Sequence, residues 1–527
     1  MGTKNFSNAN DLITFSRSSA GTALRPISYG DELVTNGTFD TDTSGWTPVI
    51  NDGDFSVIDG VARLTKGSTN PSVYQNITTN IGSVYVASLE FTGRDGADLQ
   101  FSATTSSVSS SFFSTTGLVN LVFVATSSVE EMEIQLGFAV TGEWIEFDNV
   151  SVKEVLFDQG TLTLFNHPAG IPRIEYDADG NVLGLLVEES RTNVLTYSQS
   201  FESQWLKIRL TVLQNQAQAP DGSNTAVKVV PNTDNSNHYL YQTYSAGTHT
   251  WTIYAKAGEY GRISLWEGGV TAKYTSFDLN SGTKLQGNAD ADSITSVGNG
   301  WYRLSMTVTV ASGTPYFVVA ALNNEVLAYS TSFVGDGTSG IYIWGAQVEQ
   351  GAFSTSYIPT SGATATRAAD VASIPVSAFG YNQSAGTVVA NYVTYAPNAN
   401  ISAEAWRLAD GSDFDSTIFQ YVRYSASSNQ STVFGYSESS LDIDMRLSGL
   451  AITGTYHKSA TAIKENDYAL SIDGSTPATD SSAGVPSVST LHIGGDTSGS
   501  RELNGHIKSI KYYPRKLTAA QLQEQTT

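Results

Sequence analysis

The stretch at residues 172–193, PRIEYDADGNVLGLLVEESRTN, decides how the chain is organised. Asp179 and Gly180 stand between two short runs of strand-forming residues, and an Asp-Gly pair in that setting is a turn signal. The stretch is therefore predicted to form a local hairpin or a tight corner. Its end, at residues 188–191, is a polar and charged corner that follows an apolar strand.

The amino-acid sequence of this stretch resembles a junction segment of predicted bacteriophage and prophage tail-fibre and receptor-binding proteins. In that family, an opening of the type TFxRxSxGT precedes the junction, and a β-sandwich beginning YSxxFxxxxW follows it. Residues 14–22, TFSRSSAGT, match the opening, and residues 197–205 match the start of the sandwich. The two halves are separated here by residues 31–154, which we interpret as a domain inserted into the junction.

Length and composition favour a protein of several all-β domains. The chain has 527 residues, enough for roughly three or four domains. Only 15% of the residues are charged and 11% are aromatic, which is typical of β-structure with many turns. The predicted fold is a tandem of antiparallel β-sandwiches. Because the chain has no cysteine, disulfides, thiolate metal sites and cysteine nucleophiles are excluded.

The net charge argues against two classes of partner. Lys and Arg number 28 and Asp and Glu number 50, so the net charge is −22. Nucleic acid and anionic membranes both need clustered basic residues. The sequence contains no 18-residue apolar run, and its N-terminus lacks the apolar core of a secretion signal. Together with the resemblance, this indicates a virion component made in the host cytoplasm.

Strand patterns and resemblances divide the chain into five predicted parts. Residues 33–46 resemble the opening of jelly-roll carbohydrate-binding modules, and residues 491–513 resemble the concanavalin A-like and laminin-G-like domains. A short amphipathic helix is predicted at residues 514–524. The parts are an N-terminal virion-attachment and junction segment (1–30), the inserted jelly-roll domain (31–154), a second junction segment (155–195), a second jelly roll (196–368) and a concanavalin A-like domain (369–527). The first segment is too short for a core of its own, so we expect it to pack on the rest of the chain, on a sister subunit or on a virion socket.

No catalytic residues are predicted. A glycosidase needs two carboxylates at a defined separation, but neighbours such as Glu188 and Glu189 point to opposite faces of a strand. Neither a His-x-x-x-His pair nor a Gly-x-Ser-x-Gly motif is present. A dyad built from distant residues is invisible in one sequence. The sequence therefore favours a protein that is not an enzyme.

Glycan binding is the more plausible chemistry, because sugar rings stack on Trp and Tyr. Trp46, Trp205 and Trp301 are candidates by residue type, although aromatic residues near strand starts usually fill a core, which is the interpretation we prefer for them. The candidate glycan-binding residues are those of the last domain: Trp406, Tyr421 and Tyr424.

Two further sites are predicted. Asp148 stands where related modules can hold a structural Ca²⁺, which is the only cofactor indicated. Glu188, Glu189 and Arg191 are predicted to form contacts between subunits around a symmetry axis. The alternative for these three residues is a solvated turn with a local Glu–Arg pair, which would add little stability.

The family resemblance implies a tail fibre that recognises a host-surface glycan and mediates adsorption. It also implies a homotrimer whose N-terminus attaches to other tail proteins, with no nucleic acid partner and no membrane insertion. The alternatives are a capsid-decorating or neck fibre, and a polysaccharide-degrading tail enzyme.

Overall fold

The computed structural model describes residues 13–202, 204–395, 402–411, 416–425, 428–437, 440–448, 454–496 and 501–527. The chain divides into two compact units. We call Met1–Arg25 together with Leu162–Thr527 the composite unit, and Pro26–Thr161 the inserted unit. The inserted unit encloses the segment 31–154 that was interpreted as an insertion.

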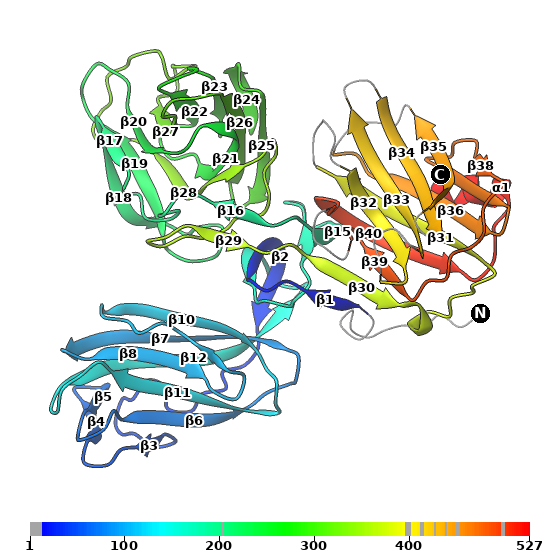
Figure 1. Cartoon of the computed structure of the whole chain (residues 1–527). Coiled ribbons are helices and arrows are strands. Elements are labelled where there is room, and N and C mark those ends of the chain that lie inside the picture. The colour runs from blue at the N-terminus through cyan, green and yellow to red at the C-terminus, as the bar shows by residue number, and fades with distance from the viewer. Residues whose placement is uncertain are drawn as a thin grey trace. The chain divides into compact units, whose positions relative to one another are not determined.

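The inserted unit is a sandwich of two antiparallel sheets (Figure 1). One sheet contains β10, β7 and β12, with β5 and β4 added beside β12, and the other has the order β3-β6-β11-β8-β9. Alternate residues of β11, namely Met132, Ile134 and Leu136, are fully buried, because the period of a strand sends every second side chain to one face. The strands are β3 (Thr47–Val49), β4 (Asp54–Ile58), β5 (Val61–Thr65), β6 (Ser72–Thr78), β7 (Val84–Asp95), β8 (Asp98–Ala103), β9 (Val108–Ser109), β10 (Gly117–Val124), β11 (Val129–Gly137) and β12 (Trp144–Phe157).

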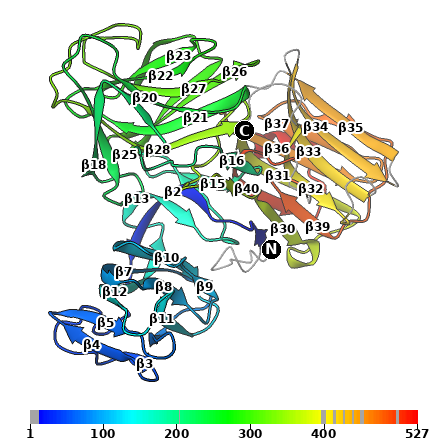
Figure 2. The same cartoon turned by 60° about the vertical axis from the view of Figure 1, so that its left-hand side comes forward.

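The composite unit contains two sandwiches, of which the first spans β17 to β28 (Figure 2). Its two six-stranded sheets have the orders β17-β20-β27-β22-β23-β24 and β18-β19-β28-β21-β26-β25. The strands are β17 (Leu206–Ile208), β18 (Leu210–Ala217), β19 (Ala226–Pro231), β20 (Tyr239–Thr243), β21 (Gly247–Lys256), β22 (Arg262–Gly268), β23 (Tyr274–Asp278), β24 (Thr283–Gly287), β25 (Ala291–Gly298), β26 (Trp301–Val310), β27 (Tyr316–Leu322) and β28 (Ile341–Gln350).

The second sandwich of the composite unit recruits strands from the beginning of the chain. Its sheets have the orders β1-β30-β39-β32-β33-β34-β35 and β14-β15-β40-β31-β36-β37-β38. Strands β1 (Thr14–Ser16), β14 (Ile174–Tyr176) and β15 (Val182–Val187) are joined by β30 (Val371–Pro375), β31 (Ala385–Thr394), β32 (Ser402–Ala409), β33 (Ser416–Ser425), β34 (Ser428–Ser437), β35 (Ser440–Ser448), β36 (His457–Lys464), β37 (Tyr468–Ile472), β38 (Ala478–Asp480), β39 (Thr490–Ile493) and β40 (Gly505–Tyr513).

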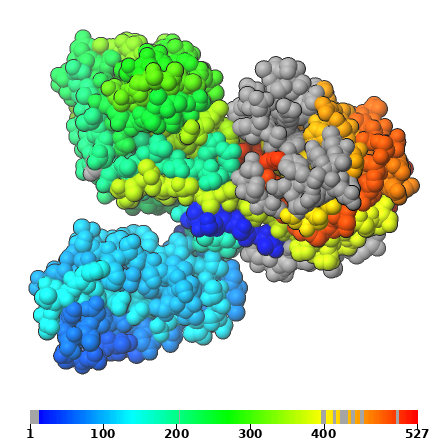
Figure 3. Space-filling view, in the orientation of Figure 1, coloured from blue at the N-terminus to red at the C-terminus, as the bar shows by residue number. Residues whose placement is uncertain are grey.

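The N-terminal strand therefore packs on its own chain. Residues of β1 pair with β30, so that Thr14 lies opposite Ser373 and Ser16 opposite Val371. Figure 3 shows the blue N-terminal residues against the yellow residues around β30. Three packing partners were expected for this short segment: the rest of the chain, a sister subunit or a virion socket. The described residues of the segment, from Ile13 onward, pack on the rest of the chain.

The predicted hairpin at Asp179-Gly180 is confirmed. Strands β14 and β15 pair antiparallel across it, and β15 continues the sheet by pairing with β40. Gly180 has a φ of +82°, a left-handed conformation that glycine adopts without a steric penalty. The turn is closed by Asp177, whose Oδ1 accepts hydrogen bonds from the backbone N–H groups of Asp179 and Asn181.

The C-terminal helix is shorter and later than the sequence predicted. Helix α1 spans Ala519–Thr526, where residues 514–524 were expected. Thr518 is its N-cap, and Thr518 and Gln521 form a reciprocal capping box, which satisfies two backbone donors at the helix start. The cap therefore sets the first helical residue at 519. Within the described residues, no helix is long and apolar enough to cross a membrane.

Candidate functional site

A buried ion network holds the segments of the composite unit together at the junction. It consists of Arg17, Arg173, Glu188, Arg367 and Asp370, all at most 5% exposed. Arg17 Nη1 lies 3.0 Å from Asp370 Oδ1, and Arg173 Nη2 lies 2.9 Å from Glu188 Oε2 and also contacts Asp370. Arg367 approaches both acids, at 3.5 and 3.8 Å. We call these five residues the junction network.

The charges of the junction network depend on one another. Burial alone would raise the pKa of the Glu188 carboxyl, but Arg367, Arg173 and two hydrogen bonds from Ser356 hold that pKa well below its usual range. Three guanidinium groups thus enclose the carboxyl groups of Glu188 and Asp370. Because a buried charge is tolerated only when it is paired and hydrogen-bonded, each member requires the others.

His167 lies buried beside the same arginines, and this predicts how stability depends on pH. Burial, and then the charges of Arg25, Arg173 and Arg17, hold the pKa of His167 well below its usual value. Below about pH 6.5 the unfolded chain therefore binds a proton that the folded chain does not, so the contribution of His167 to the stability of the composite unit should fall as the pH falls.

We expect this loss between pH 7 and pH 5, at up to about 1.4 kcal/mol per pH unit for one proton. The stabilisation that the Glu188 carboxylate receives from its arginines is lost only at lower pH, below the unfolded carboxyl pKa. The measurement is urea unfolding at several pH values for the wild type and for His167→Gln. The stability of the variant relative to the wild type should rise as the pH falls, and a constant difference would contradict the assignment. Other buried groups, such as His249, whose pKa burial also lowers, titrate in both proteins and cancel in this difference.

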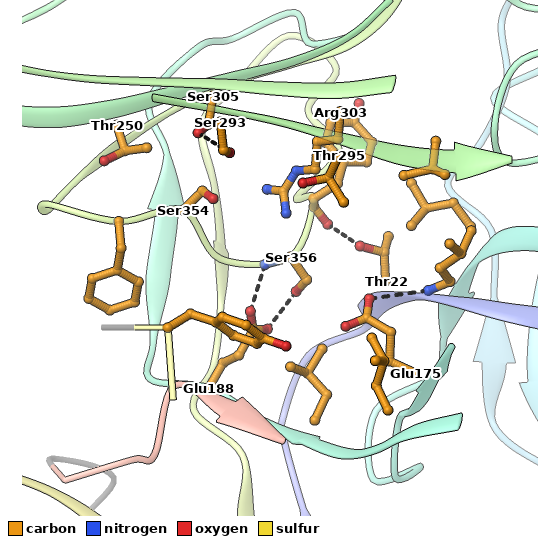
Figure 4. Close-up of a pocket in the computed structure, with 18 of the residues that line it drawn as sticks. Thr22, Glu175, Glu188, Thr250, Ser293, Thr295, Arg303, Ser305, Ser354 and Ser356 are labelled. Atoms are coloured by element: carbon orange, nitrogen blue, oxygen red, sulfur yellow. Dashed lines mark hydrogen bonds between the residues drawn. The ribbon is translucent and has the colours of Figure 1, made fainter. Parts of the chain in front are cut away.

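A cavity of about 650 Å³ lies beside the junction network, within the composite unit. We call it the junction cleft. One wall is formed by hydroxyl side chains that alternate along β25 and β26, and the other side is formed by the hairpin β14–β15 and by β40 (Figure 4). The hydroxyl residues of the first wall are Ser293, Thr295, Ser305 and Thr307, with Thr250 of β21 beside them.

The hydroxyl wall is built by strand periodicity. Strands β25 and β26 pair with Ser293 opposite Ser305, and the two Oγ atoms lie 2.7 Å apart. Thr250 and Thr307 form a similar pair at 2.8 Å. A hydroxyl group has one donor and two acceptor lone pairs, so the Ser293–Ser305 pair keeps a donor and acceptors for a ligand. Thr250 and Thr307 also bond to the carbonyls of Gly351 and Ala352, so that pair keeps acceptors only.

Arg303 is the arginine of this wall. Its Nη2 donates to the backbone carbonyl of Thr355, whereas its Nε has no hydrogen-bond partner among the described residues. Figure 4 shows the guanidinium directed into the space between the strands above and Glu188 and Glu175 below. A guanidinium presents several donors in a fixed plane, so Arg303 can bind an oxygen-rich ligand.

A chain of three hydrogen-bonded side chains lies on the opposite side of the cleft. His506 Nε2 is 2.7 Å from Glu175 Oε2, and His506 Nδ1 is 3.1 Å from the Tyr395 hydroxyl. Glu175 comes from β14 and His506 from β40, while Tyr395 is 38% exposed. Carboxylate, imidazole and phenol thus stand in a row that ends at solvent.

The predicted glycan-binding residues belong to β32 and β33, which are not strands of the junction cleft. Trp406 is fully buried, and its Nε1 donates to Gln420 Oε1 at 2.7 Å. Its indole therefore has no exposed face for a sugar ring, and we reassign Trp406 to the core. Tyr421 and Tyr424 are residues of β33, and the structure describes their backbone but not their side chains.

The preferred interpretation of the three other tryptophans is confirmed. Trp46, Trp205 and Trp301 are 6%, 3% and 2% exposed, and each belongs to a hydrophobic core.

The residues predicted to contact another subunit make contacts within the chain. Glu188 is buried in the junction network, so it cannot meet another subunit while that network is formed. Arg191 Nε lies 2.5 Å from Glu189 Oε1, and the Arg191 guanidinium lies 4.6 Å from the centre of the Phe353 ring. This is the local Glu–Arg pair of the alternative interpretation, in a more buried form.

Asp148 lies near two other acidic residues, Glu90 and Asp40. Burial, and then the charges of Glu90 and Asp40, raise the pKa of its carboxyl. Among the residues that the structure describes, no three His, Asp or Glu side chains are grouped so that they could hold a metal ion. Because Ca²⁺ also binds backbone and amide oxygens, the calcium site at Asp148 stays a prediction.

Sequence reasoning missed the residues of the junction cleft. The alternation of hydroxyls at 293, 295, 305 and 307 was the only signal present in the sequence. Glu175 and His506 are 331 positions apart, and no local pattern links them.

Comparisons with known proteins were made on sequence and on structure. No protein-family model and no curated protein matches the chain. Among solved structures, the CBM22-1-CBM22-2 tandem domain of Paenibacillus barcinonensis Xyn10C is 11% identical over 61% of this chain and 98% of its own, with a TM-score of 0.20. Domains LG4-5 of the mouse laminin alpha1 chain are 11% identical over 67% of this chain and 96% of theirs, with a TM-score of 0.20.

A third similar structure corrects one expectation. Trypanosoma rangeli sialidase is 11% identical over 94% of this chain and 97% of its own, with a TM-score of 0.22. Because an enzyme stands among the matched structures, the sequence-based exclusion of enzymatic activity is withdrawn. TM-scores near 0.2 assign no function to this chain. The sheets themselves confirm the predicted class, a tandem of antiparallel β-sandwiches, and the resemblance to tail fibres stays a prediction.

Proposed function

We propose that the protein recognises glycans and that the junction cleft binds a short saccharide. The observation that carries this proposal is the lining of the cleft, where hydroxyl side chains and Arg303 face a carboxylate–imidazole–phenol chain across a cavity of about 650 Å³. Small-molecule sites typically have volumes of about 300–1,000 Å³.

The chemistry of the lining fits a saccharide better than an apolar ligand. A sugar presents hydroxyl donors and acceptors around its ring, and the cleft offers both kinds of partner on opposite sides. Tyr176 and Phe353 add aromatic surface to the lining, which suits the apolar face of a sugar ring. An apolar ligand would leave these polar groups without partners, at a cost in affinity.

The cellular setting that we propose is a virion fibre that attaches to a host-surface glycan. This part rests on the resemblance at residues 14–22 and 172–193 to phage tail-fibre proteins. In that setting the protein is a homotrimer attached to other tail proteins through its N-terminus, and three clefts convert weak single-site binding into firm adsorption. A capsid-decorating or neck fibre would use the same cleft, and immunogold labelling of intact particles separates the positions.

The test of the cleft is a variant that fills it. Thr295 is exposed on the edge strand β25, so Thr295→Trp should fold normally and occupy the cavity. We expect its affinity for oligosaccharides from bacterial capsules and O-antigens, measured by calorimetry after array screening, to fall at least about tenfold, a change of about 1.4 kcal/mol.

The matched control is Leu213→Trp. Leu213 is 41% exposed on β18, at the opposite edge of the same sheet, and the substitution should leave affinity unchanged. Equal binding by Thr295→Trp and the wild type would remove the cleft as the site. Failure of the wild type to bind any of the oligosaccharides would remove the proposal itself.

A further inference from the structure

Six aromatic side chains form a continuous band on one face of the first sandwich of the composite unit. The face belongs to the sheet that contains β20, β27, β22 and β23. Tyr241 and Trp266 both lie opposite Val318, and Tyr274 lies opposite Trp266, so these residues form one row across four strands. We call the six residues the aromatic band: Tyr239, Tyr241, Trp266, Tyr274, Tyr316 and Tyr329.

The rings touch one another along the band. The ring centres of Tyr316 and Tyr241 are 5.1 Å apart, and those of Tyr239 and Trp266 are 5.6 Å apart. Tyr329 stacks on Trp266 at 4.0 Å with an interplanar angle of 13°, and it lies 5.3 Å from Tyr274. The band is therefore a single aromatic surface.

The band lies outside the main core of the sandwich, and two of its members, Tyr239 and Tyr329, pack against a smaller buried cluster on the same face. The alternate residues Leu240, Leu265 and Phe317 are fully buried in the core, and strand periodicity sends their neighbours to the other face. All six aromatic side chains are partly exposed. Their burial is thus incomplete, as expected for a surface that contacts something outside the sandwich.

The polar atoms of the band have no partners in the protein. None of the five tyrosine hydroxyls donates or accepts a hydrogen bond with another residue that the structure describes, and the same holds for Trp266 Nε1. Tyrosine hydroxyls that pack against protein normally find a partner. The band therefore combines aromatic faces with five available hydroxyl groups.

A polar hollow continues the same face. Gln286 of β24 lies opposite Ser276 of β23, and Gln286 borders a hollow that is also lined by Asn323, Thr331 and Ser332. The lining also includes the carboxylate of Glu325 and the apolar side chains of Val326, Leu327, Phe333 and Val334. Arg262, at the end of the same face, is balanced by Asp278 at 3.8 Å.

We propose that the aromatic band and this hollow bind an uncharged linear polysaccharide, as a second glycan site separate from the junction cleft. Ring faces stack on the sugar rings, and the tyrosine hydroxyls and Gln286 bond to sugar hydroxyls. A second protein surface with an apolar face would leave the five hydroxyls unsatisfied. Among the described residues that line the hollow, Glu325 is the charged one, and its negative charge selects a neutral chain over an anionic one. The inference rests on glycan recognition as the function but not on the cleft.

The experiment is affinity electrophoresis of the full chain in gels that contain galactomannan, xyloglucan or, as an anionic comparison, alginate. We expect the neutral polymers to retard the wild type. The double variant Tyr241→Ala/Tyr274→Ala should lose at least about tenfold in affinity, whereas Tyr241→Phe/Tyr274→Phe should keep most of it because the ring faces remain. Bound polymer should also change the tryptophan fluorescence, and Trp266→Phe should reduce that change.

Two controls separate this proposal from its alternatives. Tyr74→Ala removes a half-buried strand tyrosine of the inserted unit and should bind as the wild type. Thr295→Trp should lose the short oligosaccharides and keep the polymers. Retardation by alginate alone, or equal retardation of the wild type and the folded double alanine variant, would overturn the aromatic band. Loss of all polymer binding in Thr295→Trp would assign both ligands to the cleft.

Discussion

Arg173→Ala is expected to lower the free energy of unfolding of the composite unit by about 3–5 kcal/mol. Arg173 is fully buried and contacts both Glu188 and Asp370. Removing its guanidinium leaves two carboxylates in the interior with less compensation, and an uncompensated buried charge is among the most costly changes in a protein.

The loss extends to neutral hydrogen bonds. Arg173 Nη1 donates to the Thr22 carbonyl at 3.0 Å and to Ser356 Oγ at 2.6 Å. Thr22 belongs to the N-terminal segment, and Ser356 lies near the end of the part predicted as the second jelly roll. The variant should therefore loosen segments that are far apart in sequence. Arg173→Lys should not restore stability, because an ammonium group cannot reproduce the planar set of donors.

The measurement is chemical unfolding of the full chain, followed by tryptophan fluorescence. Arg446→Ala provides the matched control, since Arg446 is 54% exposed and pairs with Asp444 at 2.6 Å on the surface. Exposed pairs contribute about 0–1 kcal/mol, so this variant should unfold almost as the wild type does. Similar small losses in Arg173→Ala and Arg446→Ala would show that the junction network does not stabilise the unit.

The comparison of sequence and structure explains why the network itself was not predicted. The resemblance singled out the segments that contain Arg17, Arg173 and Glu188, and strand alternation correctly predicted sandwiches. The ion pairs of the network could not be predicted in the same way, because Arg17 and Asp370 are 353 positions apart in the sequence. Charged residues in a polar stretch are equally consistent with a solvated turn and with a buried network. Only the folded structure distinguishes these two possibilities.

The site was harder to predict than the fold, for a related reason. An aromatic residue type does not say which face of a strand it occupies. Trp406 lies inside its sandwich, whereas Tyr239 and Tyr241 flank the buried Leu240 and lie outside. The direction follows from which alternate residue enters the core, and that choice depends on strands distant in sequence. The junction cleft likewise needs β14, β26 and β40 together.

Glu502→Gln is expected to stabilise the composite unit at alkaline pH, in contrast to most substitutions of buried residues. Glu502 is 1% exposed, and neither of its carboxyl oxygens has a hydrogen-bond partner among the described residues. Burial, and then the negative charges of Asp496, Glu189 and Asp370, raise its pKa to about 8. The folded protein therefore holds a proton that the unfolded chain releases near pH 4.5.

The sign of the pH dependence follows from this difference. Between about pH 4.5 and pH 8 the folded state binds more protons than the unfolded state, so the contribution of Glu502 to stability falls as the pH rises. Above pH 8 the carboxylate is ionised in both states, and the cost is complete. An amide has nearly the same shape and no charge, so the variant should avoid a cost on the order of 5 kcal/mol at pH 9.

The difference between the two unfolding free energies is the quantity to measure, at pH 5, 7 and 9. It should be small at pH 5 and grow steadily in favour of Glu502→Gln. Glu465→Gln, at an exposed position, should follow the wild type throughout. A constant difference across the range would mean that Glu502 ionises alike in both states. A growing difference would show that this buried acid is protonated in the folded protein, in contrast to Glu188, whose pKa the arginines hold well below its usual range.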